Sequence, residues 1–287
     1  MKIPTLPALA LVVASATSAL AQQNFDKVEI KIAHVAGNVH LLEGAGGNIG
    51  VSVGPEGLLI VDTQFLPLAD KIDAALARLS PGPLKFVLNT HWHGDHTGGN
   101  PHFGKRASVV AHDNARKRLL AAKSTPKEAL PLVTFNQTVS VHFNGEEIKI
   151  TSLVPGHTDG DALINFTKSG VFHTGDQFLN HRFPYIDLGS GGDFLGYVKN
   201  IDFMVSVIPA DAKIIPGHGA LATKADLIAT QQMLAETTAL VRTAIAEGKT
   251  QAQIRAAGVP EKYKEWGAGF INTNRYLDAV YNALTAK

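Results

Sequence analysis

Three histidines and one aspartate fall within six residues in the stretch Asn89-Thr90-His91-Trp92-His93-Gly94-Asp95-His96-Thr97-Gly98-Gly99-Asn100. Just upstream, residues 84–88 form a short apolar run that predicts a buried strand, so the cluster lies where a strand ends. Imidazole and carboxylate are ligands that zinc prefers, and a loop anchored on a rigid strand can hold several of them in fixed directions. The stretch therefore predicts a metal site, in preference to a polar loop that is merely rich in histidine.

The sequence on both sides of this stretch predicts two β-rich blocks, each followed by helices. Residues 28–61 read as successive β segments separated by turn residues, which predicts an antiparallel meander, and strand patterns return at 108–111, 138–172 and 213–215. Apolar residues at helical spacing predict helices at 67–80, 113–122, 194–208, 224–247 and 273–284. No linker rich in proline or serine separates the blocks, so we expect residues 22–287 to form one domain of mixed α/β structure.

Residues 1–21 differ in character from the rest of the chain. Lys2 precedes an apolar run at 6–13, and the segment ends in Ala19-Leu20-Ala21, which is the pattern of a cleaved secretory signal. The prolines in this segment and its short apolar run argue against a membrane anchor. We expect export, to the periplasm or as a secreted protein, with cleavage after Ala21 and no attachment of the mature chain to a membrane.

Composition limits the classes of partner. Of the 287 residues, 45% are hydrophobic and 18% are charged, which is ordinary for a globular protein. Without residues 1–21 the chain carries 25 Lys and Arg against 25 Asp and Glu, so nothing indicates binding to nucleic acid or anionic lipid. Cysteine is absent, so an exported fold depends on its core and on metal instead of disulfides. The expected partner is a small-molecule substrate, and the oligomeric state stays open.

Three further candidate ligands stand in glycine-containing turns after apolar β runs. They are His157 in Pro-Gly-His-Thr, Asp176 in Thr-Gly-Asp, and His218 in Pro-Gly-His-Gly. Glycine lets the backbone turn sharply, which brings the neighbouring side chain to the rim of the sheet. One histidine after a strand is more often structural, but four strand ends that offer five histidines and two aspartates are typical of a metal centre.

With these motifs the chain resembles the metallo-β-lactamase superfamily of hydrolases. The matching elements are H-x-H-x-D-H at 91–96, G-H-T at 156–158, T-G-D at 174–176 and P-G-H-G at 216–219, in the same order. The resemblance implies an αββα sandwich, in which two mixed β-sheets lie face to face between outer helices. It also implies that loops at one edge of the sandwich hold two metals.

The resemblance further implies how two zinc ions share the ligands. One zinc takes His91, His93 and His157. The other takes Asp95, His96 and His218, and Asp176 bridges both. Members that open β-lactams usually carry cysteine or serine at the place of Asp176, whereas aspartate is typical of glyoxalase II-like and lactonase-like hydrolases. Export to the compartment where β-lactams act favours a β-lactamase instead.

The ligand set implies a hydrolytic mechanism. A metal-bound hydroxide forms near neutral pH and attacks a carbonyl carbon, so no serine nucleophile is needed. Asp95 is the expected catalytic residue, because it could orient the hydroxide and pass a proton to the leaving group. The expected function is hydrolysis of a small amide, ester, lactone or thioester. The alternatives are a β-lactamase, an iron-dependent persulfide dioxygenase from another reaction class, and a metal-binding protein without turnover.

Four more residues are candidates for the surroundings of the metals. Asp62, at the end of the meander, either hydrogen-bonds a ligand histidine or caps a local turn. Trp92 projects away from the metals, either as a pocket wall or into the core. Asn180 and Arg182 lie in a turn-rich segment, residues 180–192, and either hold a substrate carboxylate or belong to a surface loop.

Overall fold

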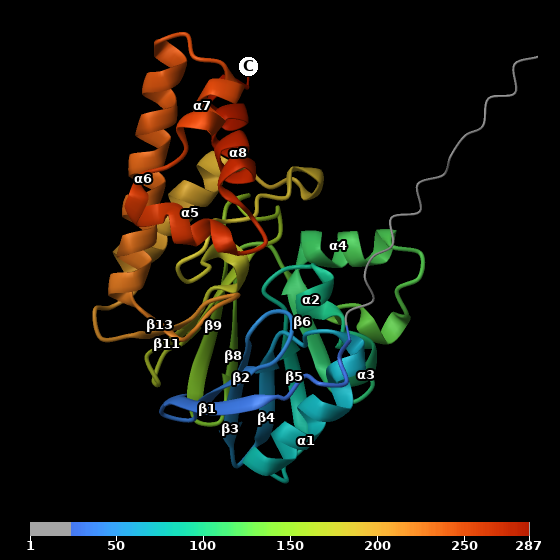
Figure 1. Cartoon of the computed structure of the whole chain (residues 1–287). Coiled ribbons are helices and arrows are strands. Elements are labelled where there is room, and N and C mark those ends of the chain that lie inside the picture. The colour runs from blue at the N-terminus through green and yellow to red at the C-terminus, as the bar shows by residue number, and fades with distance from the viewer. Residues whose placement is uncertain (1–23, 287) are drawn as a thin grey trace, which may run out of the picture.

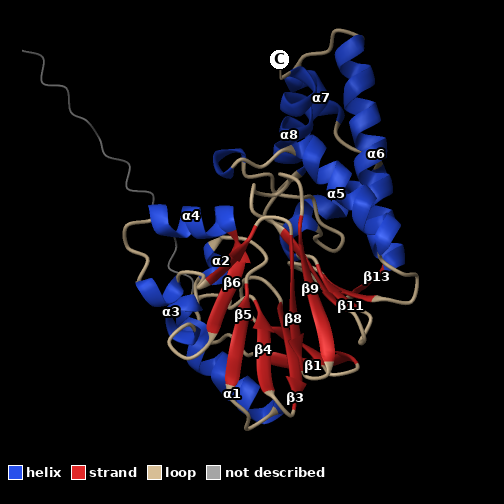
Figure 2. Cartoon of the chain, turned by 180° about the vertical axis from the view of Figure 1, so that it is seen from behind, coloured by secondary structure: helices blue, strands red, loops and turns tan. Residues whose placement is uncertain are grey.

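The chain folds into two β-sheets that lie face to face, with helices over their outer faces (Figures 1 and 2). The computed structural model describes residues 24–286, so the predicted signal segment lies outside the described residues. Among residues 24–286, no helix combines the length and the apolar character that crossing a bilayer requires. The expected αββα sandwich is confirmed.

The first sheet contains seven strands in chain order. They are β1 (Lys31–Ala36), β2 (Val39–Glu43), β3 (Ile49–Gly54), β4 (Gly57–Val61), β5 (Leu84–Leu88), β6 (Ser108–His112) and β7 (Val133–Phe135). The first four form the predicted antiparallel meander, and β4 to β7 run parallel. The crossovers carry helices, namely η1 (Leu66–Leu68), α1 (Ala69–Leu79), α2 (Gly94–Thr97), α3 (Asn100–Phe103), α4 (Asp113–Ala121) and η2 (Lys127–Ala129).

The second sheet contains six strands in the spatial order β13-β12-β11-β10-β9-β8. They are β8 (Thr138–Phe143), β9 (Glu146–Ser152), β10 (Ala162–Phe166), β11 (Val171–His173), β12 (Lys213–Ile215) and β13 (Ala222–Thr223). Only β11 and β12 pair in parallel. The remaining helices are η3 (Gly175–Gln177), η4 (Leu188–Ser190), α5 (Phe194–Val207), α6 (Lys224–Ala246), α7 (Gln251–Ala257), η5 (Glu261–Ala268) and α8 (Thr273–Thr285).

Side-chain alternation along the strands produces the layers. On β4, Leu59 and Val61 point between the two sheets, whereas Leu58 and Ile60 point outward against α1. A third apolar cluster lies between the second sheet and helices α5, α6 and α8. Because β4 is buried on both faces, its carboxyl end is rigidly placed, and so is the loop that follows it.

The five predicted helices are present as α1, α4, α5, α6 and α8. A capping box begins α6, since the Asp226 carboxylate accepts from the Thr223 backbone N–H at 2.8 Å. One prediction is wrong in its position, because the strand expected at 28–32 forms as β1 at Lys31–Ala36. The ammonium of Lys71 donates to the carbonyl oxygens of Phe25 and Val28, which ties this part of the backbone to α1 instead of to β2.

Candidate metal centre

The seven candidate ligands come together at one edge of the sandwich from four loops. These loops follow β5, β9, β11 and β12. The glycines near the candidate ligands allow sharp backbone turns and also leave space for the ligand side chains. A Cβ at Gly217 would collide with the Asp176 carboxylate, and a Cβ at Gly47 would collide with the His96 ring. Close approach of backbone to ligand therefore requires glycine at both positions.

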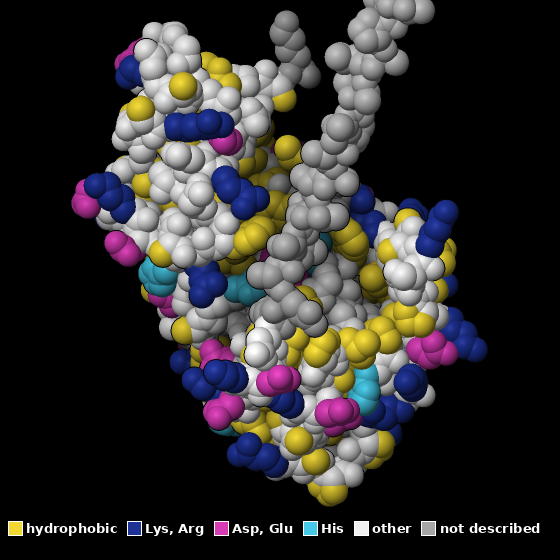
Figure 3. Space-filling view, turned by 45° about the vertical axis from the view of Figure 1, so that its right-hand side comes forward, with side chains coloured by type: hydrophobic (Ala, Val, Ile, Leu, Met, Phe, Trp, Pro, Cys, Tyr) yellow, Lys and Arg dark blue, Asp and Glu magenta, His cyan; other side chains and the backbone are white. Residues whose placement is uncertain are grey.

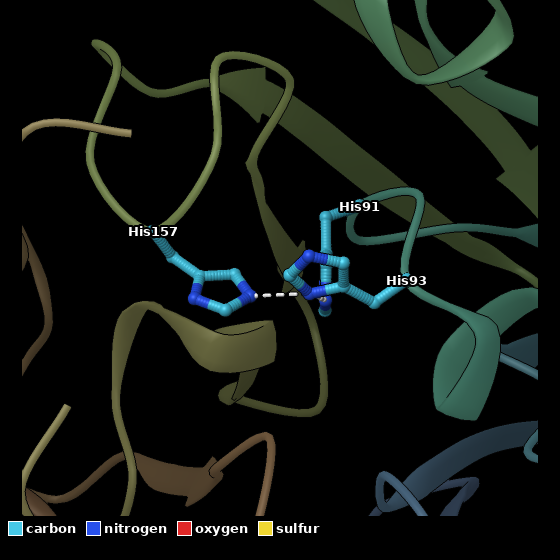
Figure 4. A group of neighbouring side chains, drawn as sticks. All are labelled: His91, His93 and His157. Carbon is cyan, nitrogen blue, oxygen red and sulfur yellow. Dashed lines mark hydrogen bonds between the residues drawn. The ribbon is translucent and has the colours of Figure 1, made fainter. Parts of the chain in front are cut away.

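His91, His93 and His157 form one group, whose ring nitrogens face one another (Figure 4). Nδ1 of His93 lies 3.1 Å from Nε2 of His91 and 2.9 Å from Nε2 of His157. His91 and His157 are buried. Three nitrogens from loops far apart in the sequence thus converge on one point.

The outer nitrogens of these rings show which nitrogens carry protons. His93 Nε2 lies 2.8 Å from the Asp187 carboxylate, and His157 Nδ1 lies 2.7 Å from the carbonyl oxygen of Tyr185. Both partners can only accept, so both outer nitrogens donate. The Thr90 hydroxyl donates to Asp62, so its oxygen is left to accept from His91 Nδ1 at 3.0 Å. In the neutral rings the three converging nitrogens carry lone pairs, an arrangement that fits a cation.

Asp95, His96 and His218 form the second group. The Asp95 carboxylate lies 3.2 Å from His218 Nε2 and 3.6 Å from His96 Nε2. On its other side, His96 Nδ1 lies 2.7 Å from the Asp62 carboxylate and donates to it. The inner nitrogen of His96 is therefore free to act as a ligand in the neutral ring.

Asp176 connects the two groups. Its Oδ1 lies 3.2 Å from His96 Nε2 and 3.5 Å from His218 Nε2, and its Oδ2 lies 3.6 Å from His157 Nε2. Oδ1 is buried, and no hydrogen bond to it is formed within residues 24–286. A buried carboxylate oxygen without a hydrogen bond is costly unless a cation compensates it, so this position also fits a metal.

Burial and neighbouring charge divide the histidines into two electrostatic classes. Burial lowers the pKa of His157 to about 4, since the raising effect of Asp176 is smaller and His93 lowers the value further. Burial followed by the neighbouring His96 also holds the pKa of His91 well below its ordinary value. Burial lowers the pKa of His218 as well, but Asp176 and Asp95 outweigh it and raise the pKa to about 9. The three-histidine group thus carries little charge, whereas the second group contains charged side chains.

A cleft of about 670 Å³ opens above the two groups. Its base is formed by candidate ligands, namely His93, Asp95, Asp176 and His218. Its walls are mostly apolar and include Phe65, Trp92, Tyr185, Phe270 and Ile271. Hydrophobic side chains gather along the recess between the helical part and the sheet part of the molecule, with histidine exposed beside it (Figure 3).

The four residues expected around the metals lie at different distances from the ligands. Asp62 is fully buried and contacts His96 directly. Trp92 and Arg182 both line the cleft. Asn180 is not part of the cleft lining, because its side-chain amide donates to the carbonyl oxygen of Ala220 at 3.1 Å and so supports the turn that carries His218.

Two partners of the ligands were not assigned from the sequence. Asp187 and Tyr185 belong to the turn-rich segment 180–192, and they hold His93 and His157 respectively. The backbone N–H of Asp187 also donates to the carbonyl oxygen of His157 at 2.9 Å. The residue types in this segment gave no signal that separated these two contacts from those of a surface loop.

Two facing sheets carry at one edge a cluster of histidines and aspartates of the kind that can hold metal ions. The family model described as the metallo-beta-lactamase superfamily matches residues 42–218, so the chain belongs to this superfamily. The matched region begins in β2 and ends at His218, and it contains all seven candidate ligands.

Curated relatives are similar over part of their length. The lactamase-like protein nscB of Trichophyton rubrum (strain ATCC MYA-4607 / CBS 118892) is 28% identical over 201 residues, which are 67% of this chain and 57% of that protein. The lactamase-like protein vrtG of Penicillium aethiopicum is 27% identical over 188 residues, which are 65% of this chain and 56% of that protein. The chain thus spans little more than half the length of these relatives.

Solved structures share the fold at low sequence identity. The inverting sec-alkylsulfatase Pisa1 from Pseudomonas sp. matches with a TM-score of 0.71 and 16% identity, over 89% of this chain and 50% of that one. The DIM-1 metallo-beta-lactamase matches with a TM-score of 0.63 and 20% identity, over 72% of this chain and 98% of that one. These similarities concern the fold and do not identify a substrate.

Proposed function

We propose that the protein is a binuclear zinc-dependent hydrolase of small amide, ester, lactone or thioester substrates. The observation that carries the proposal is the position of Asp176 at the base of the cleft. One of its oxygens faces His96 and His218, and the other faces His157. A carboxylate shared by two groups of nitrogen ligands supports a two-metal site, and membership of a superfamily of hydrolases supports the reaction class.

Metals bound in such a site supply an acidified water molecule and a Lewis acid for the substrate oxygen. We assign the proton transfer to Asp95, and its position in the cleft lining and its partial exposure support this assignment. Burial raises the pKa of Asp95, but His96 and His218 outweigh it, so the pKa is lowered and the carboxylate is ionised at neutral pH. An ionised Asp95 accepts a proton from water and returns it to the leaving group.

The groups that accept from the outer ring nitrogens of the candidate ligands, here called outer partners, also support the proposal. Asp62 and Asp187 accept from His96 and His93, and the Tyr185 carbonyl accepts from His157. Each contact fixes the tautomer in which the ring nitrogen that faces the centre has a lone pair. The apolar walls of the cleft reduce access of bulk water, which strengthens the electrostatic effects inside.

Metal analysis combined with a substrate panel tests the proposal. About two zinc ions per chain, together with turnover of a β-lactam, lactone, ester or thioester, are the expected result. A single iron per chain with oxidation of a persulfide would instead establish the dioxygenase. Turnover of β-lactams alone within the panel would identify a β-lactamase. Export belongs to the proposal too, and N-terminal sequencing of the protein from its native host, expected to begin after Ala21, checks it.

Asp95→Asn tests the assigned proton transfer. General acid–base groups contribute about 10²- to 10⁴-fold to rate, so we expect a loss of that size in kcat with an intact fold. Asp211→Asn is the matched control, because Asp211 is exposed and lies after α5, away from the cleft. Metal content is measured on both variants. Turnover of the Asp95 variant within about twofold of the parent protein would remove this role.

A further inference from the structure

Arg182 lies where two hollows of the surface meet. It lines the cleft of about 670 Å³ above the metal groups and also an adjoining hollow of about 460 Å³. Gly46 and His218 also line both hollows. The guanidinium-bearing residue thus borders the same space as a proposed metal ligand.

Within residues 24–286 no carboxylate lies at ion-pair distance from Arg182, although Glu43 lines the adjoining hollow with it. Arg106, Arg118 and Arg255 each form an ion pair with an aspartate, whereas no ion pair within residues 24–286 involves Arg182. Each aspartate that lines the cleft already contacts a histidine. Asp187 contacts His93, whereas Asp95 and Asp176 contact the histidines of the second group. A guanidinium without a partner at the wall of a cleft is suited to bind a carboxylate through two parallel hydrogen bonds.

The remainder of the cleft wall is suited to bind an apolar part of a substrate. The Tyr185 ring stacks beside His93 at a centroid distance of 6.0 Å, and Phe270 packs edge-on against Tyr185 at 5.6 Å. Phe270 is 74% exposed, so the aromatic surface continues from a proposed ligand to the rim of the cleft. Trp92 and Phe65 also belong to the lining. Such surfaces bind aromatic or extended apolar groups by burial and stacking.

We infer that the substrate is an acyl compound with one carboxylate, which Arg182 binds, and an aromatic or extended apolar part, which lies on the wall formed by Tyr185 and Phe270. The scissile carbonyl then lies near Asp95 and His218. Among residues 24–286 the cleft lining contains one arginine and no lysine, so it matches a single anionic group and disfavours substrates with several phosphates. This inference rests on the proposed hydrolase function and adds the substrate class.

Matched pairs of substrates test the inference on the metal-loaded enzyme. Each pair consists of an aryl-acyl thioester with a distal carboxylate and the same compound with that carboxylate converted to a primary amide. We expect the parent protein to prefer the carboxylate member by at least about tenfold in kcat/KM, as a hydrogen-bonded charged group typically contributes this much. Arg182→Gln is expected to lower kcat/KM for the carboxylate member by about 10- to 100-fold, mainly through KM, and to change the amide member by less than about twofold.

Arg242→Gln is the charge-matched control, because Arg242 is exposed on α6 and does not line the cleft. It should leave both members unchanged. Equal turnover of the two members by the parent protein, or an equal loss for both in Arg182→Gln, overturns the inference and leaves the hydrolase function standing.

A lack of turnover for every compound and variant would contradict the hydrolase function and not the role of Arg182. In that case the aryl-acyl carboxylate product is titrated while tryptophan fluorescence is followed, since Trp92 lines the cleft. Binding that Arg182→Gln weakens at least tenfold supports the anion site. Binding equal in the two proteins, or no binding to either, overturns it.

Discussion

Replacing Asp62 with asparagine tests how much of the metal centre depends on one buried carboxylate. Asp62 Oδ1 accepts from the Thr90 backbone N–H at 2.8 Å. Asp62 Oδ2 accepts from the Thr90 hydroxyl at 2.7 Å and from His96 Nδ1 at 2.7 Å. The backbone at Asp62 is left-handed, with φ of 65°, a conformation that asparagine also adopts readily. The substitution therefore preserves the turn and changes the chemistry.

The amide removes an acceptor at the point where two donors meet. An NH₂ group in place of Oδ2 faces the N–H of His96, a conflict that is relieved when the ring proton moves to Nε2 of His96. That nitrogen faces Asp176 at 3.2 Å and cannot bind a metal while it is protonated. The effect reaches His91 as well, because its Nδ1 contacts the Thr90 hydroxyl.

We expect the Asp62→Asn variant to bind metal about 10- to 100-fold more weakly at both sites, a cost of about 1.4–2.7 kcal/mol per ion. The fold should lose about 1–3 kcal/mol of stability, because a buried donor is left without an acceptor. The assay titrates metal-free protein with zinc against a chromophoric chelator, with thermal unfolding measured in parallel. The exposed-site variant Asp211→Asn is the control. Unchanged dissociation constants at both sites in a folded variant would refute the reasoning.

Four further changes separate the parts of the site. Asp187→Asn removes the acceptor of the ring N–H of His93, and it should weaken the three-histidine site alone by about 10- to 100-fold in the same chelator titration. Gly217→Ala should abolish binding of at least one ion, because the added Cβ collides with the Asp176 carboxylate, and elemental analysis checks this. Asp161→Ala leaves three buried donors without an acceptor, and it should reduce the free energy of unfolding by about 2–4 kcal/mol in a urea titration. Chelation of metal present at about 1,000 times its dissociation constant should remove about 4 kcal/mol of stability, and calorimetry showing no fall in Tm would contradict a metal bound to the native state.

The clustering of the candidate ligands was predictable because their signal is local. Four features, the H-x-H-x-D-H loop and the glycine turns around His157, Asp176 and His218, each with the strand before it, lie within short windows of sequence. Hydrophobic alternation predicts those strands, and β9, β11 and β12 run in the same direction, so the loops after them meet at one edge of the second sheet. The loop after β5 reaches the same edge because the first sheet packs face to face with the second.

Asp62 was one of the alternatives predicted at the end of the meander, and it does contact His96. The outer partners Asp187 and Tyr185 were not predictable, because each depends on a long-range contact made by an irregular segment. His93 and Asp187 are 94 residues apart, and Asp187 follows no strand. Sequence pattern did not distinguish Arg182 from Asn180 either, since both are polar residues of the same segment. Their roles diverge because the backbone at Asn180 hydrogen-bonds His218 and directs its side chain to the turn at Ala220, whereas Arg182 follows two residues later at the border of the cleft.

The segment 180–192 therefore serves the metal groups and the cleft wall at once. The Tyr185 ring lines the cleft while its carbonyl oxygen holds His157, and the Asp187 carboxylate holds His93 from the next turn of the same segment. A change of backbone here that reshaped the wall would also displace ligand partners, so wall shape and metal affinity are coupled through Tyr185. Arg182 contacts no candidate ligand by hydrogen bond or ion pair within the described chain. In the proposed enzyme, substitution of Arg182 would therefore change selectivity for a substrate anion and leave the candidate ligands in place, whereas substitution of an aromatic residue of the wall such as Tyr185 would affect both.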